Sequence, residues 1–179
     1  YLAMLKKMKK GHFSKFLFLT FFITIVGSLS SQSLSKKEER ELLDKAEYYY
    51  SEKYYKTAAD FFGDLNKNKP NDPYYKLMLG ICYTHIPAQY TKSLELLKDV
   101  KKQNPDFNEV NRHLGRAYAV NHMFDESIDQ YEIYLRDEDL EQEEKSEARR
   151  MIDYCQNAKK LIKDSLTVEI KNIGNPVNT

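Results

Sequence analysis

Five side chains of this sequence are candidates for nucleophilic or metal chemistry: Cys82, Cys155, His85, His113 and His122. A nucleophile needs a base within hydrogen-bond reach, and a zinc site needs Cys and His ligands at short, regular spacings. The five residues show neither arrangement, and no glycine-rich phosphate loop is present. We therefore expect no catalytic residues, no metal site and no cofactor, and we expect the three histidines to lie on helical surfaces.

The acidic run "RDEDLEQEE", residues 136–144, is a further candidate for cation binding. Acidic residues also stabilise the first turn of a helix, and charged runs are usually solvated. The run directly precedes a pattern that places apolar residues on one helical face. It is therefore interpreted as a connector and a helix start.

The stretch "AEYYYSEKYYKTAADFF", residues 46–62, is rich in aromatic side chains. A stacking surface for single-stranded nucleic acid would combine aromatics with a basic groove. Here Lys and Glu alternate, and the net charge of the chain is only +1. We expect no nucleic-acid partner and no small-molecule substrate, and we expect Tyr49, Tyr55, Phe61 and Phe62 to be mostly core.

Small, aromatic and proline residues recur along the chain at a fixed period. Ala46, Gly80 and Gly115 stand 34 and 35 residues apart, and a Tyr follows each of them by three positions. Three further sets keep the same register. They are a second series of small residues, a series of large residues four positions later, and two prolines: Ala58, Ser93 and Ser127; Phe62, Leu97 and Tyr131; Pro70 and Pro105. A period of this length indicates stacked helical hairpins.

These positions resemble the tetratricopeptide repeat, a helix–turn–helix unit of about 34 residues. The resemblance covers residues 39–141 and implies an all-α, tetratricopeptide-type helical solenoid of three helix pairs plus a capping helix. The domain is expected at 35–165, with repeats near 39–72, 73–107 and 108–141 and a capping helix at 142–164. The helix pairs are predicted at 36–51 and 55–68, 73–85 and 91–103, and 108–121 and 125–137.

Local signals mark several of these elements. Ser35 with Glu38, and Asp106 with Glu109, indicate capping boxes, while Asp72 before a proline indicates an N-cap. An array of repeats needs a cap at its end. The predicted cap carries its apolar residues on one face: Ala148, Met151, Ile152, Cys155, Ala158 and Leu161.

The small residues predict close helix contacts. At Gly115 we expect Leu to overpack the contact and Ala to be tolerated, because Ala46 holds the same place in the first repeat. Cys82 and Cys155 fall in different layers of such an array, more than disulfide reach apart. We therefore predict two free thiols.

In the tetratricopeptide family, the first helix of each repeat lines a groove that holds a peptide or protein. Carried over to this sequence, the resemblance implies thirteen groove residues: Arg40, Leu43, Glu47, Tyr50, Tyr74, Leu77, Ile81, Thr84, His85, Glu109, Arg112, Arg116 and Ala119. The set suits a segment whose acidic end meets Arg112 and Arg116. Alternatively, some of these positions meet the next domain of the same chain.

Co-chaperone activity is disfavoured by the same comparison. Chaperone-binding arrays hold a C-terminal carboxylate with a Lys/Asn clamp, and this sequence has Leu43 and Glu47 in those places.

The N-terminal segment, residues 1–31, has the layout of a secretory signal peptide. It contains five lysines and no acid, then an apolar run at 16–26, then Ser28 and Ser30 at the −3 and −1 sites. The run is shorter than the roughly 20 residues of a membrane span. We expect cleavage after Ser30 or Ser31 and an exported protein. Because the chain begins with Tyr1 and not with Met, we expect a misassigned start or a fragment.

The segment 166–179 ends in "NIGNPVNT", after a short alternating stretch that a lone strand could not stabilise. We interpret it as a linker or the start of a further domain. Together with the signal peptide and the array, it resembles the N-terminal region of outer-membrane-associated proteins of Bacteroidetes-type bacteria. In that family a β-propeller and an OmpA-like peptidoglycan-binding domain follow, and some members serve type IX secretion.

The function expected from the sequence is a non-catalytic protein–protein interaction scaffold in the periplasm, associated with the outer membrane, that docks an envelope or secretion-apparatus component. The alternatives are a passive spacer and an accessory domain for a further C-terminal region, peptidoglycan-binding or catalytic. Fold alone does not decide among them.

Overall fold

The structure, a computed structural model, describes residues 34–163. Within that range it consists of helices and turns: α2 (Lys36–Ser51), α3 (Tyr55–Asn68), α4 (Pro73–Tyr83), the 3-10 helix η1 (Pro87–Gln89), α5 (Tyr90–Gln103), α6 (Glu109–Val120), α7 (Phe124–Tyr134) and α8 (Gln142–Lys163). The predicted all-α class, with three helix pairs and a capping helix, is confirmed. The predicted signal peptide and the segment 166–179 lie outside the described residues.

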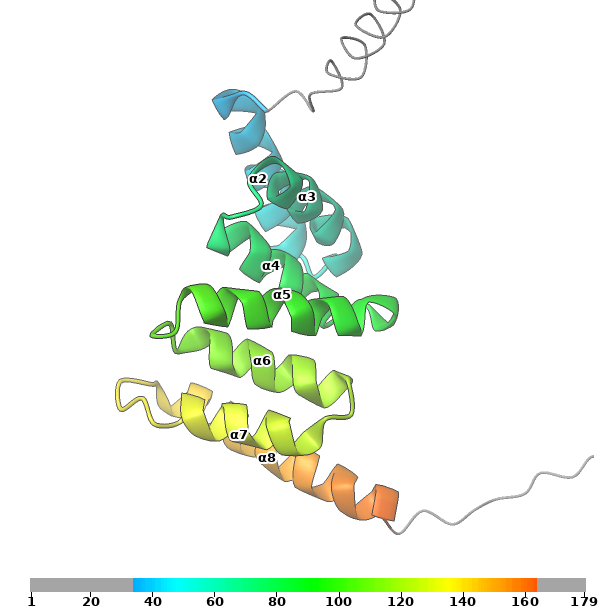
Figure 1. Ribbon diagram of the computed structural model, residues 1–179, viewed down its shortest axis with the longest axis vertical. Helices are drawn as coiled ribbons and strands as arrows, with labels where there is room; N and C mark the ends of the chain where they lie inside the picture. The colour runs from blue at the N-terminus through cyan, green and yellow to red at the C-terminus, as the bar shows by residue number, and fades with distance from the viewer. Residues whose placement is uncertain (1–33, 164–179) are drawn as a thin grey trace, which may run out of the picture. The chain divides into compact units, whose positions relative to one another are not determined.

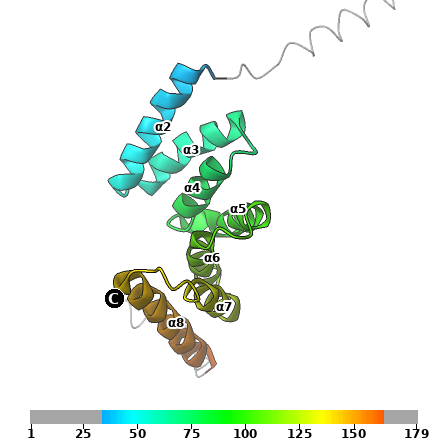
Figure 2. The same cartoon turned by 90° about the vertical axis from the view of Figure 1, so that its left-hand side faces the viewer.

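Successive helices pack against each other, so that α2–α3, α4–α5 and α6–α7 form three stacked pairs with α8 after them (Figure 1). Figure 2 shows α5 and α7 on one side of the stack, and α2 and α8 reaching towards the other side, with α4 and α6 between them. Direct contacts also join α4 to α6 and α6 to α8. The surface formed by α2, α4, α6 and α8 is called the inner face below.

Small residues let the two helices of a pair approach closely. A Cβ atom placed on Gly115 would lie 2.7 Å from Cε2 of Tyr131. From the facing helix, the Ser127 hydroxyl donates to the Gly115 carbonyl over 2.7 Å, and in the preceding pair the Ser93 hydroxyl donates to the Gly80 carbonyl over 2.8 Å. The recurring small residues therefore mark the helix contacts that the repeat predicted.

The capping helix α8 takes the place of the first helix of a fourth pair. On each of α4, α6 and α8, three residues at positions i, i+4 and i+7 pack the helix against the helices before it. These sets are Tyr75, Leu79 and Cys82; Val110, Leu114 and Ala117; Ala148, Ile152 and Cys155. Next to the middle residue of each set, α4 and α6 carry Gly80 and Gly115, but α8 carries the exposed Asp153. A charged residue at the contact position ends the array, because no further helix can pack closely there.

The aromatic residues of the stretch 46–62 are less uniformly buried than predicted. Phe62 is fully buried, whereas Tyr49, Tyr55 and Phe61 are half-buried. Tyr49 and Phe61 stack on each other with ring centroids 5.6 Å apart. The rings therefore line the margin of the core, at the first helix pair of the described residues.

Two helix ends differ from the prediction by two or more residues, and the others agree within one residue. α7 ends at Tyr134 and not at residue 137, since the Asn108 side-chain amide donates to the Tyr134 carbonyl and to the Asp137 carboxylate. The extra residue in the second repeat forms η1, and α4 ends at Tyr83.

The capping signals were partly wrong. Asp72 caps α4 as predicted, because its carboxylate accepts the backbone N–H groups of Tyr74 and Tyr75 at 2.9 and 3.3 Å. The Asp106 capping box is absent: α6 begins one residue after Asn108, and Glu109 binds Arg112 instead of the backbone.

Two further predictions concern the cap and the thiols. Leu161 was predicted on the packed face of α8 but is exposed, because it lies beyond the last residues that contact α7. Cys82 and Cys155 are both buried free thiols, with α5, α6 and α7 between their helices. Among residues 34–163, no helix is long and apolar enough to cross a membrane.

Candidate functional site

The predicted groove residues fall on the inner face but differ in how far a partner could touch them. Ile81 and Thr84 are buried, and the Thr84 hydroxyl donates to the Ile81 carbonyl over 2.7 Å. Because their side chains are buried, these two residues leave little surface for a partner to contact. The other α4 and α6 residues of the set are described next. Four residues of the set belong to α2: Arg40, Leu43, Glu47 and Tyr50.

A carboxylate on α6 neutralises part of the predicted arginine end. Arg112 is paired with Glu109, to which its Nε donates over 2.8 Å, and His113 Nε2 lies 3.3 Å from the same carboxylate oxygen. Glu147 of α8 reaches Arg112 at 3.7 Å. Burial alone would raise the pKa of Glu109, but hydrogen bonds from His113 and Arg112 lower it to about 2. Arg112 is therefore already compensated, contrary to the sequence prediction.

Arg116, one turn further along α6, remains without a counter-charge. No carboxylate within residues 34–163 forms an ion pair with it, and its Nε is buried with no hydrogen-bond acceptor. Buried polar groups of proteins are nearly always satisfied, and an uncompensated charge is costly. The guanidinium of Arg116 is thus the one arginine of the predicted pair that is left to hold a carboxylate.

His85 stands beside this arginine and is not the surface histidine expected from the sequence. Its ring stacks on Tyr55 of α3, with centroids 3.6 Å apart and planes 10° from parallel. Burial, then the nearby Arg116 and His113, lowers the pKa of His85 to about 4. Burial also lowers the pKa of His113. Both imidazoles are therefore neutral at pH 7, and only His122 of the three histidines is exposed.

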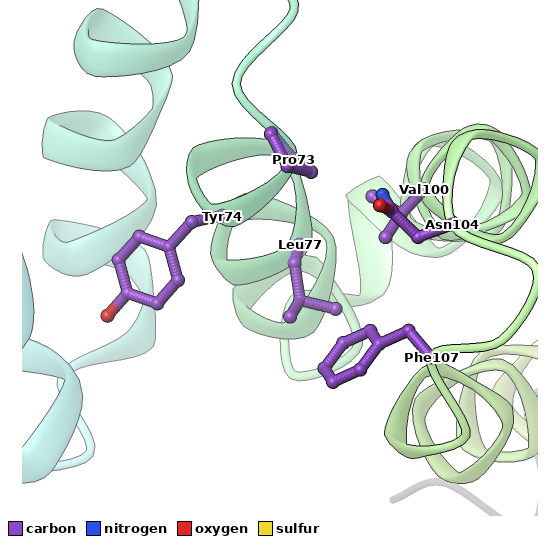
Figure 3. Close-up of a pocket in the computed structure, with 6 residues that line it drawn as sticks. All are labelled: Pro73, Tyr74, Leu77, Val100, Asn104 and Phe107. Atoms are coloured by element: carbon purple, nitrogen blue, oxygen red, sulfur yellow. The ribbon is translucent and has the colours of Figure 1, made fainter.

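An apolar pocket, called the Leu77 pocket here, opens between the start of α4 and the α5–α6 connection (Figure 3). It has a volume of about 290 Å³ and is lined by Pro73, Tyr74, Leu77, Val100, Asn104 and Phe107. Figure 3 shows Leu77 and Phe107 pointing towards each other, with Val100 and Asn104 across from them. The Tyr74 hydroxyl donates to Glu47 of α2 over 2.7 Å. The pocket can take one apolar side chain at the edge of the inner face.

Comparison of the sequence with known families and known proteins found no match. Comparison of the structure with solved structures did. The TPR domain of P58(IPK) matches with a TM-score of 0.60 and 19% identity over 72% of this chain and 36% of that one. The first TPR domain of human RPAP3 matches with a TM-score of 0.57 and 17% identity over 68% and 94%. The first TPR of Spaghetti, bound to the HSP90 peptide SRMEEVD, matches with 0.56 and 16% over 70% and 98%. The fold is a tetratricopeptide solenoid.

The tetratricopeptide register also reveals inner-face residues that the sequence prediction missed. Glu147, Arg150 and Tyr154 of α8 hold the places that Glu109, Arg112 and Arg116 hold on α6, as the matching packing residues of the two helices require. The acidic connector before α8 is longer than the earlier turns, so the register shifts and the 34-residue period does not reach these residues. The spacing of Ala148, Ile152 and Cys155 was the signal that could have found them.

A second pocket of the tetratricopeptide domain lies between α6 and α8, and is called the α6–α8 pocket. Its volume is about 360 Å³, and it is lined by Tyr90, Arg116, Ala119, Val120, His122, Met151 and Tyr154. It unites two predicted groove residues, Arg116 and Ala119, with two residues of the cap. The inner face therefore extends onto α8.

Proposed function

We propose that the chain is a non-catalytic interaction scaffold that is exported to the periplasm and docks an acidic segment of an envelope or secretion component on its inner face. The observation that carries the proposal is the uncompensated guanidinium of Arg116 in the middle of that face. An arginine without a counter-charge favours a ligand that brings a carboxylate.

Two further observations support a bound segment of protein. The Spaghetti domain, which has the same fold, was solved with an acidic peptide. In this chain the Leu77 pocket offers an apolar site that includes Tyr74 and Leu77, two of the predicted groove residues. A few charged and apolar anchors of this kind commonly carry most of the energy of an interface.

A bead-bound library of random 12-residue peptides tests the proposal. The full chain is labelled with a fluorophore, and the beads that bind it should carry peptides enriched in Asp and Glu. Arg116→Glu should remove that enrichment and favour Lys and Arg, because it reverses the charge at the site. Arg149→Glu is the matched control, since Arg149 is exposed on α8 away from the pocket. Selected peptides without acidic enrichment would contradict the proposal. An acidic enrichment that Arg116→Glu and Arg149→Glu reduce equally would also contradict it.

Export rests on the N-terminal segment: five lysines, an apolar run and the small residues Ser28 and Ser30. Expression of the full chain in a bacterium with an outer membrane, followed by mass spectrometry of the mature N-terminus, tests it. The expected product begins at Ser31 or Gln32 and is recovered from the periplasmic fraction. A cytoplasmic chain with an intact segment 1–31 would contradict export but leave the inner-face proposal standing.

A further inference from the structure

The cap α8 presents more apolar surface to the inner face than a terminating helix needs. Tyr154 is 57% exposed although it adjoins a pocket, and Met151 lies beside it on the same wall. The helix ends the array through its other face, where Asp153 stands. The solvent-facing ring of Tyr154 therefore has no role in closing the solenoid.

The α6–α8 pocket combines three kinds of group that favour an aromatic ring. The Tyr90 and Tyr154 rings offer edge or offset contacts, the Met151 thioether offers a sulfur–aromatic contact, and the Arg116 guanidinium can stack on a ring face. Its volume of about 360 Å³ lies at the lower end of the range for ligand pockets. A single large side chain is the occupant that such a site accommodates.

We propose that the α6–α8 pocket takes an aromatic side chain of the docked segment, directly beside the carboxylate that pairs with Arg116. The recognised feature is thus an acidic residue adjacent to Phe, Tyr or Trp, and α8 contributes Met151 and Tyr154 to the specificity site. The inference rests on the proposed function, because it names the chemistry of the segment that binds the inner face.

Charge complementarity determines the occupant. No acidic side chain lines the pocket, and Arg116 has no carboxylate partner among the described residues. A wholly apolar occupant would bury that guanidinium without a counter-charge, which is unfavourable. An acidic-aromatic pair compensates the charge and fills the apolar space together.

The same bead-bound peptide library tests the inference with a different readout, namely the residue next to the enriched acid. Wild-type protein should enrich aromatic residues there. Tyr154→Ala should abolish the aromatic enrichment while the acidic enrichment remains, and Tyr154→Phe should restore it. Tyr48→Ala is the matched control, because Tyr48 is 60% exposed on α2, outside the pocket. For one retained peptide, replacing its aromatic residue by Ala should weaken binding to wild type about tenfold, and to Tyr154→Ala much less.

The outcomes separate the two proposals. Acidic enrichment without an aromatic neighbour, or an aromatic preference that survives Tyr154→Ala, overturns the inference and leaves the proposed function intact. Retention of no peptide at all contradicts the proposed function and, with it, the inference. Because Tyr154 is largely exposed, thermal melting of Tyr154→Ala should match wild type, so a lost preference reports the pocket and not the fold.

Discussion

The ring of Tyr131 lies against the backbone of Gly115 so closely that no Cβ atom fits between them without movement. Three ring atoms would stand 2.7 to 2.9 Å from a Cβ at this position. Tyr131 is buried and cannot swing away, because its ring packs under α8 with Ala148. This close contact, together with the hydrogen bond from Ser127 to the Gly115 carbonyl, joins α6 to α7.

Replacement of Gly115 should therefore destabilise the protein even when the new residue is Ala. The sequence led us to expect Ala to be tolerated, since Ala46 holds the same place in the first repeat, but the facing Tyr131 leaves less room than that comparison assumed. We predict that Gly115→Ala lowers the free energy of unfolding by about 1 kcal/mol and Gly115→Leu by about 3 kcal/mol. Urea denaturation measures both.

Gly63 supplies the matched control for that experiment. It lies inside α3, and a Cβ there would meet no other atom within 4 Å. Gly63→Ala should stabilise the protein by about 0.5–1 kcal/mol through helix propensity alone. Equal effects of Ala at positions 63 and 115 would mean that the Gly115–Tyr131 contact is not close.

Lys53 and His122 hold left-handed backbone conformations, with φ of 63° and 60°. Each follows the first helix of a pair, at the tight turn into the second. Such a conformation is unfavourable for residues with a Cβ and free of strain for glycine. Lys53→Gly and His122→Gly should each raise the thermal midpoint, by a stability gain of about 0.5–1 kcal/mol. A fall in the midpoint for both variants would contradict the turn geometry.

The Asp72 carboxylate caps α4, whereas Asp106 caps nothing. Asp72→Ala should cost about 1 kcal/mol of stability, because the first backbone N–H groups of α4 lose their acceptor. Asp106→Ala should leave the stability unchanged within about 0.5 kcal/mol. Thermal melts of the two single variants provide the comparison. A larger loss of stability for Asp106→Ala than for Asp72→Ala would indicate that Asp106 does cap α6.

The stability of the protein should depend on pH through His85. The pKa of His85 is about 4 in the folded state, first because of burial and then because of Arg116 and His113, against roughly 6.5 in an unfolded chain. As the pH falls from about 6.5 to 4, the unfolded chain binds a proton that the folded protein does not. The free energy of unfolding should therefore decrease through this window and change no further from this group below it.

His85→Phe tests that assignment while keeping a ring against Tyr55. Urea denaturation between pH 4 and 8 should show a weaker pH dependence for the variant than for wild type. Identical slopes would mean that His85 is not the titrating group.

The sequence was sufficient to predict the fold because its evidence is local and repeated. Ala46, Gly80 and Gly115 keep one period, and the close helix contacts that they imply are the contacts observed. Boundaries failed where a tertiary contact decided them, as when Asn108 binds the Tyr134 carbonyl and ends α7 early.

The site was predicted less completely, for two physical reasons. The positions alone do not show which charges neutralise each other. Arg112 and Arg116 therefore looked alike in the sequence, whereas in the structure Glu109 and Glu147 lie beside Arg112. The cap residue Tyr154 was missed because a longer connector shifts the register of α8.

Site-specific photo-crosslinking in the native cells tests the docking account most directly. Benzoylphenylalanine should be introduced at Tyr74 or Tyr154 on the inner face, and at Asp129 or Glu132 on the exposed side of α7. We predict a discrete adduct with an envelope protein from positions 74 and 154 that disappears with Arg116→Glu, and none from positions 129 and 132. Adducts from α7 alone, or no adduct from any position as expected of a passive spacer, would contradict the account.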